Sequence, residues 1–216
     1  MTLFRRRAAI CAVVLAAATP VALVAQRSDS YTWKLGVNAG IMAFQTRAQD
    51  TKVVPSAGAH FLIMAHKGGL MVGVDEGIGS DQGKDKDYVL FNDVRRFQAI
   101  MMAFPISGPI EPYFGGGGGI ITAVGPRIDG NLITDPADQA TLLADAKEHS
   151  ASGFLSFVGG IQGRSGRYTL FAQYEASTSP SDGQLLHGAA QTLLAGLRVG
   201  LGSDREQIGG GGYAVK

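Results

Sequence analysis

The sequence has little cysteine, charge or proline. Cys11 is the only cysteine among 216 residues, which excludes a disulfide-stabilised scaffold and a zinc site built on cysteines. Charged residues are 17% of the chain, below the ~25% of average proteins, which excludes a coiled coil and a charge-rich disordered chain. Only eight prolines accompany the 31 glycines, so the glycines do not indicate collagen. The formal net charge of +1 gives no general reason to expect a nucleic acid partner.

The N-terminal segment has the pattern of a secretory signal peptide. The basic residues Arg5–Arg7 precede the apolar run Ala8–Ala18, and Ala25 is a small residue suited to cleavage. The run is shorter than the ~20 residues that a membrane-spanning helix needs. We therefore predict that residues 1–25 direct export and are removed. The mature chain would be free of cysteine and slightly acidic, with 16 of the 19 basic residues and all 18 acidic ones.

Apolar and polar side chains alternate along most of the mature chain. In the first such segment Leu35, Val37 and Ile41 would share one face, while Lys34 and Asn38 would share the other. A period of two predicts β-strands. Eight segments show it: Thr32–Phe44, Gly58–His66, Leu70–Ile78, Val94–Phe104, Pro112–Ala123, Ser152–Gln162, Arg167–Ala176 and Gln191–Leu201.

The connections between these strands alternate in length. Short turns lie at Lys67–Gly69, Ser107–Pro109 and Gly163–Gly166, and longer connections, the first of them Gln45–Pro55, separate the other strands. An even number of strands with short turns at one end and long loops at the other is typical of bacterial outer-membrane barrels. Closure of the sheet satisfies every backbone group, as lipid requires. The pattern thus predicts an all-β, eight-stranded, antiparallel up-and-down transmembrane barrel.

Aromatic residues gather near the predicted strand ends. Two aromatic girdles, one at each membrane interface, would produce this distribution. The residues concerned are Tyr31, Trp33, Phe104, Tyr113 and Tyr168 at the turn end, and Phe44, Tyr88, Phe91 and Tyr174 at the loop end.

Two stretches are rich in glycine and aromatic residues: GPIEPYFGGGGGI from Gly108 and SGFLSFVGGIQGRSGRYTLFAQYE from Ser152. With the signal peptide and eight strands, they make the chain, over about Thr32–Gly202, resemble the small OmpA-like outer-membrane β-barrel domains. The resemblance implies a barrel over residues 26–202, with its short turns in the periplasm of a Gram-negative cell. Residues 203–216 would form a glycine-rich tail.

The inward face of this barrel is the candidate site. An eight-stranded barrel is just wide enough to be filled by side chains, and buried charges must be paired or hydrated. We expect a polar network that plugs and stabilises the lumen, with a narrow ion path or a small-ligand site as the alternative. Its predicted members are Lys34, Asp75, Arg96, Gln98, Arg167, Gln173, Glu175 and Arg198.

Other motifs give little reason to expect a cofactor or a metal. The run Gly115–Gly119 lacks the lysine of a phosphate-binding loop, and we interpret it as a place that leaves room for lumen side chains. The four histidines are not expected to be metal ligands; they are His60, His66, His149 and His187.

One enzymatic alternative is a lipid A-modifying barrel. Lipid A deacylases of this size use a serine, a histidine and an acid on the outer face, and Glu148, His149, Ser150 and Ser152 are close in this sequence. The His-x-Ser order of that family is not matched. If His149 and Ser150 were adjacent on a strand, they would also point to opposite faces. We therefore expect no catalytic residues.

The loop formed by residues 125–151 is predicted to contain a helix over Thr134–His149. Asp135 is suited to the N-cap and Pro136 to the first helical position. The helix would either cap the barrel mouth or offer a surface to an extracellular partner or ligand.

The predicted function is that of a non-enzymatic, monomeric outer-membrane protein, surrounded by lipid, with a structural or surface-interaction role. A soluble periplasmic or secreted barrel that binds a small apolar ligand, as lipocalins do, is the main alternative. The two alternatives differ in parity, that is, in which face of each strand points into the barrel. In the soluble barrel the inward side chains would include Leu193, Leu197 and Val199. The side chains that meet solvent would then include Lys34, Asp75 and Arg198.

Overall fold

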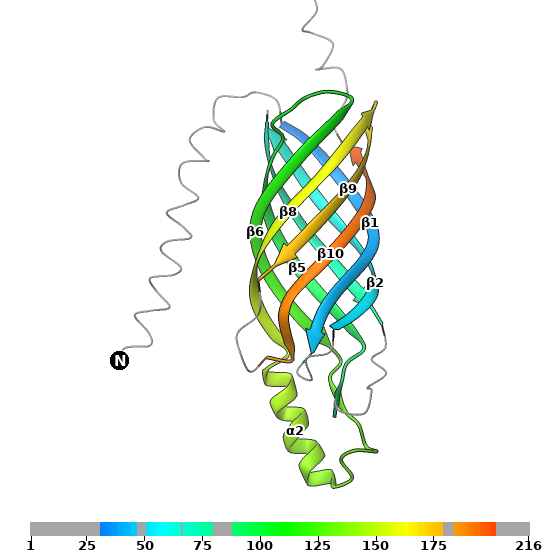
Figure 1. The fold of residues 1–216 in the computed structure, drawn as a ribbon, viewed down its shortest axis with the longest axis vertical. Coiled ribbons are helices and arrows are strands. Elements are labelled where there is room, and N and C mark those ends of the chain that lie inside the picture. Colours follow the sequence, from blue (N-terminus) through cyan, green and yellow to red (C-terminus); the bar gives the residue numbers. More distant parts are fainter. Residues whose placement is uncertain (1–30, 47–50, 66, 80–87, 179–183, 202–216) are drawn as a thin grey trace, which may run out of the picture.

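The computed structural model describes residues 31–46, 51–65, 67–79, 88–178 and 184–201. The predicted signal peptide (1–25) and tail (203–216) lie outside these residues. The described strands form a closed barrel of eight antiparallel strands, which confirms the predicted fold class (Figure 1).

Each barrel strand pairs with its neighbours in the sequence, and the first strand closes on the last. The order around the barrel is β1-β10-β9-β8-β6-β5-β3-β2. The strands are β1 (Tyr31–Thr46), β2 (Thr51–Ala65), β3 (Gly68–Ile78), β5 (Asp93–Ala103), β6 (Ile110–Val124), β8 (Ala151–Ser165), β9 (Tyr168–Ser177) and β10 (Leu186–Gly200).

The expected long connection Gln45–Pro55 is wrong, because β1 continues to Thr46 and β2 already begins at Thr51. The sequence pattern was misleading at Pro55, since proline usually marks a turn or the end of a strand. In the structure Pro55 lies within β2 opposite Ile41 of β1. Its ring occupies the outer face, in step with the alternation of the strand.

The loop end carries the remaining elements. β4 (Val89–Leu90) pairs with β7 (Arg127–Ile128) in a small separate sheet, and α2 (Pro136–Glu148) follows. The predicted helix is confirmed, including its N-cap, where the Asp135 carboxylate accepts a 2.8 Å hydrogen bond from the Ala137 amide. No helix in the described part of the chain is long and apolar enough to span a membrane.

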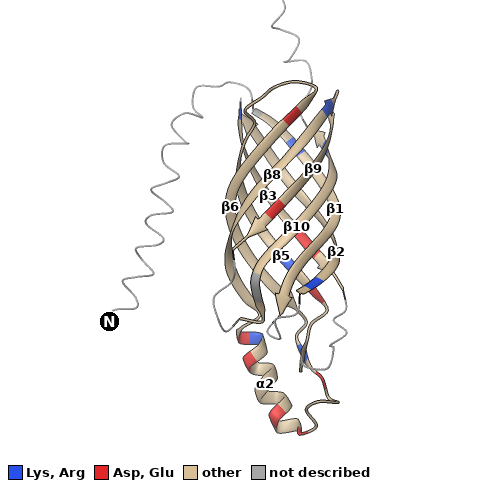
Figure 2. Ribbon diagram, in the orientation of Figure 1, with Lys and Arg blue, Asp and Glu red and all other residues tan. Residues whose placement is uncertain are grey.

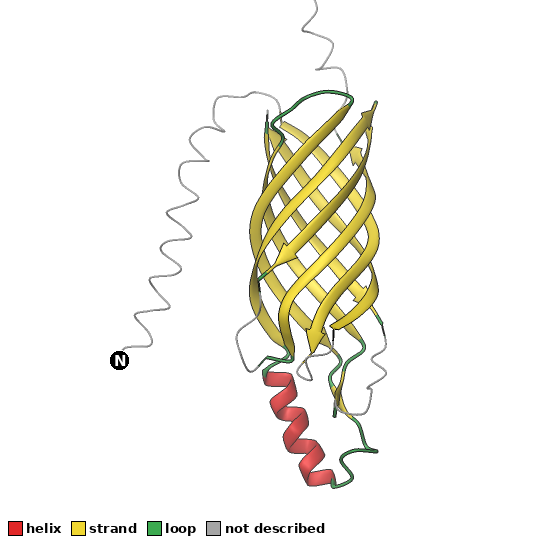
Figure 3. Cartoon of the chain, in the orientation of Figure 1, coloured by secondary structure: helices red, strands yellow, loops and turns green. Residues whose placement is uncertain are grey.

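The helix does not lie across the barrel mouth as a cap. Figure 3 shows α2 projecting away from the loop end, in line with the barrel. Within α2 only Ala146 is buried, and it packs into the apolar cluster at the mouth. The C-terminal end of the helix is therefore anchored, and the rest extends from the barrel.

Burial alternates along the barrel strands. On the outer face large apolar side chains are exposed, with 58% of Val37 and 68% of Phe157 accessible. Polar side chains on the opposite face are buried, among them Arg96 and Arg198, both at 0%. This parity is the one that a transmembrane barrel requires.

Parity also corrects the predicted aromatic girdles. Trp33, Tyr168 and Tyr174 do point outward. Phe44, Phe91, Phe104 and Tyr113 instead are buried in the interior, and Tyr88 packs against the same interior cluster as Phe44. The side chain of Tyr31 lies outside the described residues. Nearness to a strand end was a poor criterion because it ignores which face a residue occupies.

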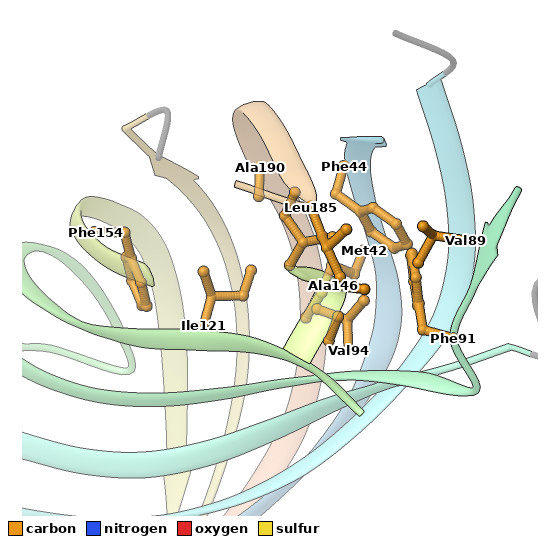
Figure 4. Close-up of a cluster of buried hydrophobic side chains, with 12 residues drawn as sticks. Met42, Phe44, Val89, Phe91, Val94, Ile121, Ala146, Phe154, Leu185 and Ala190 are labelled. Atoms are coloured by element: carbon orange, nitrogen blue, oxygen red, sulfur yellow. The ribbon is translucent and has the colours of Figure 1, made fainter. Parts of the chain in front are cut away.

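Two apolar clusters fill parts of the interior. The cluster at the loop end includes Met42, Phe44, Phe91, Phe154 and Leu186 (Figure 4). The cluster nearer the turn end consists of Leu62, Met64, Met71, Ile100, Met102, Phe104, Tyr113, Val158 and Phe171. Polar side chains occupy the space that these clusters leave.

The glycine run of β6 has a different role from the one expected. A Cβ atom at Gly117 would overlap the carbonyl oxygen of Ala99 on β5, and one at Gly119 would overlap that of Phe97. The run therefore allows two backbones to approach closely and does not chiefly make room for lumen side chains. Space of that kind is provided instead at Gly58, where a Cβ would meet the Asp75 side chain.

This geometry predicts that Gly117→Ala destabilises the barrel while Gly116→Ala does not. The added methyl at position 117 would push β5 and β6 apart, at a cost of about 1–3 kcal/mol, as in other overpacked sites. At position 116 the nearest atom to a new Cβ is 3.8 Å away, on the Phe157 ring. Urea unfolding of the two refolded variants measures the difference; equal stability would contradict the close approach.

Candidate functional site in the barrel lumen

The structure places seven of the eight predicted lumen residues inside the barrel. The buried ones are Lys34, Asp75, Arg96, Gln98, Gln173, Glu175 and Arg198. The prediction is wrong for Arg167, which is exposed and precedes β9 in the β8–β9 turn. This turn includes Gly166 with φ of +57°, a conformation that glycine adopts readily, and the alternation of β9 starts only after it.

Arg96 is the centre of the first polar group. Its guanidinium binds Asp75 at 3.0 Å and Glu175 at 3.0 Å. Asp75 lies directly opposite Arg96 on the neighbouring strand β3, whereas Glu175 is on β9. The arginine therefore links strands from two sides of the barrel across the lumen.

Three further side chains complete this group, which we call the central layer (Asn38, Asp75, Arg96, Gln98, Glu175 and Thr192). The Gln98 amide donates to Asp75 at 2.9 Å, and the Asn38 amide donates to the same carboxylate at 3.1 Å. Arg96 also donates to the Thr192 hydroxyl at 3.1 Å. With two carboxylates and one guanidinium, the layer has a formal charge of −1.

A second group lies nearer the turns and is called the turn-end layer (Lys34, His60, Glu111, Gln162, Thr169 and Arg198). Arg198 donates from Nε to His60 Nε2 and from Nη1 to Gln162 Oε1, both at 2.9 Å. The Gln162 amide donates to Glu111 at 2.7 Å. The Arg198 guanidinium also stacks on the Phe171 ring, 3.9 Å from its centroid.

Gln173 belongs to neither layer. Its side-chain oxygen accepts a 3.1 Å hydrogen bond from the Tyr113 hydroxyl. Tyr113 in turn lies between Gln173 and Arg198, whose guanidinium carbon is 5.4 Å from the tyrosine ring centroid.

About half of the residues in the two layers were not predicted from the sequence. The residues not predicted are Asn38, His60, Glu111, Gln162, Thr169 and Thr192. The alternation along the strands could have identified them, because each lies on the same face of its strand as other buried residues. Most of them are uncharged hydrogen-bonding partners, and Glu111 immediately precedes the predicted strand Pro112–Ala123.

The residues of the enzymatic alternative are not arranged as a catalytic set. His149 caps the C-terminal end of α2, as the helix predicted over Thr134–His149 implies, and does not lie on a strand. Its Nδ1 is 3.1 Å from the Asp145 carboxylate, and the Ser150 hydroxyl donates to the Lys147 carbonyl. Within the described residues, no group of three or more histidine, cysteine or acidic side chains is placed to hold a metal ion. His66 and the side chain of His187 lie outside these residues.

The lumen groups join different strands of the barrel. Several are fully buried and make bonds to partners on other strands. Charge-assisted hydrogen bonds of this kind are stronger than neutral ones, and at low local dielectric they resist rearrangement. The arrangement connects strands on different sides of the barrel across its lumen.

One comparison with a solved structure supports the fold. No protein-family model and no curated protein matches the sequence. The crystal structure of Neisserial surface protein A (NspA) is similar at a TM-score of 0.57 and 12% identity, over 79% of this chain and 99% of that one. The crystal structure of the N-terminal β-barrel domain of Pseudomonas aeruginosa OprF aligns at a TM-score of 0.42 and 8% identity, over 77% of this chain and 97% of that one.

Proposed function

We propose that this chain is an integral outer-membrane barrel with a structural or surface-interaction role, a lumen plugged by side chains and no enzymatic activity. The observation that supports this most strongly is the division of the strands into two faces. Large apolar side chains such as Leu155 and Leu170 are exposed on the outside, while Arg96 and Glu175 are fully buried within. Only a lipid environment makes that distribution favourable.

Charged residues mark both limits of the proposed membrane band. On the outer face near the loop end, Arg95 binds Glu76 at 2.8 Å. At the turn end Lys67, Arg164 and Arg167 are exposed. Figure 2 shows the charged positions of the barrel widely spaced along its strands, with others on α2. The apolar surface between these limits is the part that lipid would cover.

The soluble alternative is disfavoured by parity. Leu193 would have to face inward to line a pocket for an apolar ligand, yet 55% of its side chain is exposed. Arg198, which would meet solvent in that case, is completely buried. A soluble barrel with this surface would aggregate through its exposed apolar belt.

The loop end is the part of the protein that would extend beyond the membrane. It comprises α2, the small β4–β7 sheet and their connections. Because α2 projects from the barrel, we propose that residues 125–151 form the surface for any extracellular partner or ligand, and that the barrel itself is monomeric.

Cell fractionation tests the location. Expressed with its own N-terminal segment in a Gram-negative host, the protein should sediment with outer membranes and need detergent for extraction. Recovery in the soluble periplasm would contradict the proposal. Purified barrels added to a planar bilayer should conduct no steady current, because the lumen is filled; a stable open channel would rule out the plug.

A further inference from the structure

The turn-end layer contains more positive than negative charge. The charged groups facing Lys34 are Arg164, Arg198 and Glu111. The buried members Lys34, Arg198 and Glu111 give the layer a formal charge of +1, and the partly exposed Arg164 at its rim adds a third cation. Buried like charges are costly unless a counter-charge accompanies them.

Strand register forces these cations together. Arg198 on β10 lies directly opposite Thr169 on β9, and Thr169 lies opposite Arg164 on β8. The Thr169 hydroxyl also accepts a 3.2 Å hydrogen bond from the ammonium of Lys34 on β1. One threonine therefore has three cationic neighbours from three other strands.

The single carboxylate is already engaged elsewhere. Glu111 accepts from Gln162 at 2.7 Å and lies 3.6 Å from Arg164. Among the described residues, neither Lys34 nor Arg198 forms an ion pair within 4.0 Å. Glu111 faces Lys34 from beyond this distance, so the pair Lys34 and Arg198 has one positive charge in excess.

Arg198 also has a donor to spare. Its Nη2 is buried and makes no well-aligned hydrogen bond, although the Tyr113 hydroxyl interacts with the same guanidinium. Stacking on Phe171 occupies the face of the guanidinium and leaves its in-plane N–H groups available. A guanidinium edge beside an ammonium is a favourable environment for an anion.

We propose that the turn-end layer binds one small inorganic anion, of the size of chloride or phosphate, between Lys34 and Arg198. Access would be from the turn end, where the Arg164 side chain is 33% exposed. The central layer provides the contrast, since its arginine is paired with two carboxylates and it carries a net negative charge. The two layers would thus differ in the sign of the ion that they attract.

Isothermal titration calorimetry of the refolded full-length barrel tests this site. Sodium phosphate and, in a separate arm, sodium chloride would be titrated in non-ionic detergent, with sodium gluconate holding the ionic strength constant. We expect saturable binding of about one phosphate or one chloride per chain. Absence of saturable heat in both arms would overturn the proposal.

Matched variants separate this site from general salt effects. Lys34→Met should abolish binding, whereas Lys67→Met, which removes an exposed turn lysine, should leave it unchanged. Arg164→Gln, at a partly exposed side chain and thus compatible with folding, should weaken binding several-fold. Unchanged affinity in both Lys34→Met and Arg164→Gln, or equal losses in Lys34→Met and Lys67→Met, would overturn the assignment.

Discussion

Replacing Arg96 by methionine should lower the free energy of unfolding by about 3–5 kcal/mol, because it leaves two buried carboxylates without their cation. Asp75 and Glu175 are both within 3.0 Å of the guanidinium, and the side chains of all three are at most 3% exposed. The amides of Gln98 and Asn38 would remain, but neutral donors compensate a buried carboxylate only in part.

Arg95 provides a matched control for this experiment. It is the adjacent residue and also binds a carboxylate, Glu76, at 2.8 Å, but the two side chains are 40% and 32% exposed. Arg95→Met should therefore change stability little, as expected for surface ion pairs. Urea unfolding of both variants in lipid vesicles makes the comparison. Similar losses at positions 95 and 96 would contradict the assignment of the two residues to opposite faces.

A triple variant can show whether the loss of stability in Arg96→Met comes from uncompensated charge. Adding Asp75→Asn and Glu175→Gln to Arg96→Met removes the two orphaned carboxylates. Most of the lost stability should then return, because replacing a whole buried ionic group is far less costly than removing one partner. Persistent instability of the triple variant would instead attribute the effect to lost packing.

Replacing Val37 by arginine should destabilise the barrel in lipid by about 2–4 kcal/mol, the cost of a cation on the lipid face near the bilayer midplane. Val37 lies on the outer face of β1, 58% exposed, between Ala59 of β2 and Leu197 of β10. Both neighbours are apolar, so the new charge would have no partner beside it on the adjacent strands.

Leu132→Arg is the control, because Leu132 is comparably exposed, at 48%, but lies in the loop before α2. There the arginine would be in water, and stability should stay within about 0.5 kcal/mol of the parent. Equilibrium unfolding in phosphatidylcholine vesicles measures both variants. A Val37→Arg barrel as stable as the Leu132→Arg barrel would argue that lipid does not cover this surface.

Much of the fold could be predicted because a barrel strand encodes two faces with a period of two. The outward Leu35, Val37 and Ile41 and the inward Lys34 were enough to orient β1. The glycine run of β6 was harder to interpret. Glycine is needed there because the backbone carbonyls of Ala99 and Phe97 on β5 lie close to β6. The distance between two strands is a tertiary property that the local sequence does not contain.

The lumen site could be predicted only in part for a similar reason. Alternation identified the inward charges, but it did not show which of them would meet. Asp75 and Arg96 are register partners, whereas Glu175 reaches Arg96 from another part of the barrel. The uneven division of charge between the two layers depends on register around the whole barrel. It became visible only when eight strands were placed together.

Trp33 allows the most direct test of the central claim, that lipid surrounds the outer face. It is the only tryptophan of the chain, and its side chain is 47% exposed on the outside of β1. The unmodified protein would be refolded into vesicles containing brominated phosphatidylcholine, and separately exposed to acrylamide in water. We predict strong quenching of the tryptophan fluorescence by the brominated lipid and weak quenching by acrylamide. Strong quenching by acrylamide with none by the brominated lipid would contradict a membrane-embedded barrel.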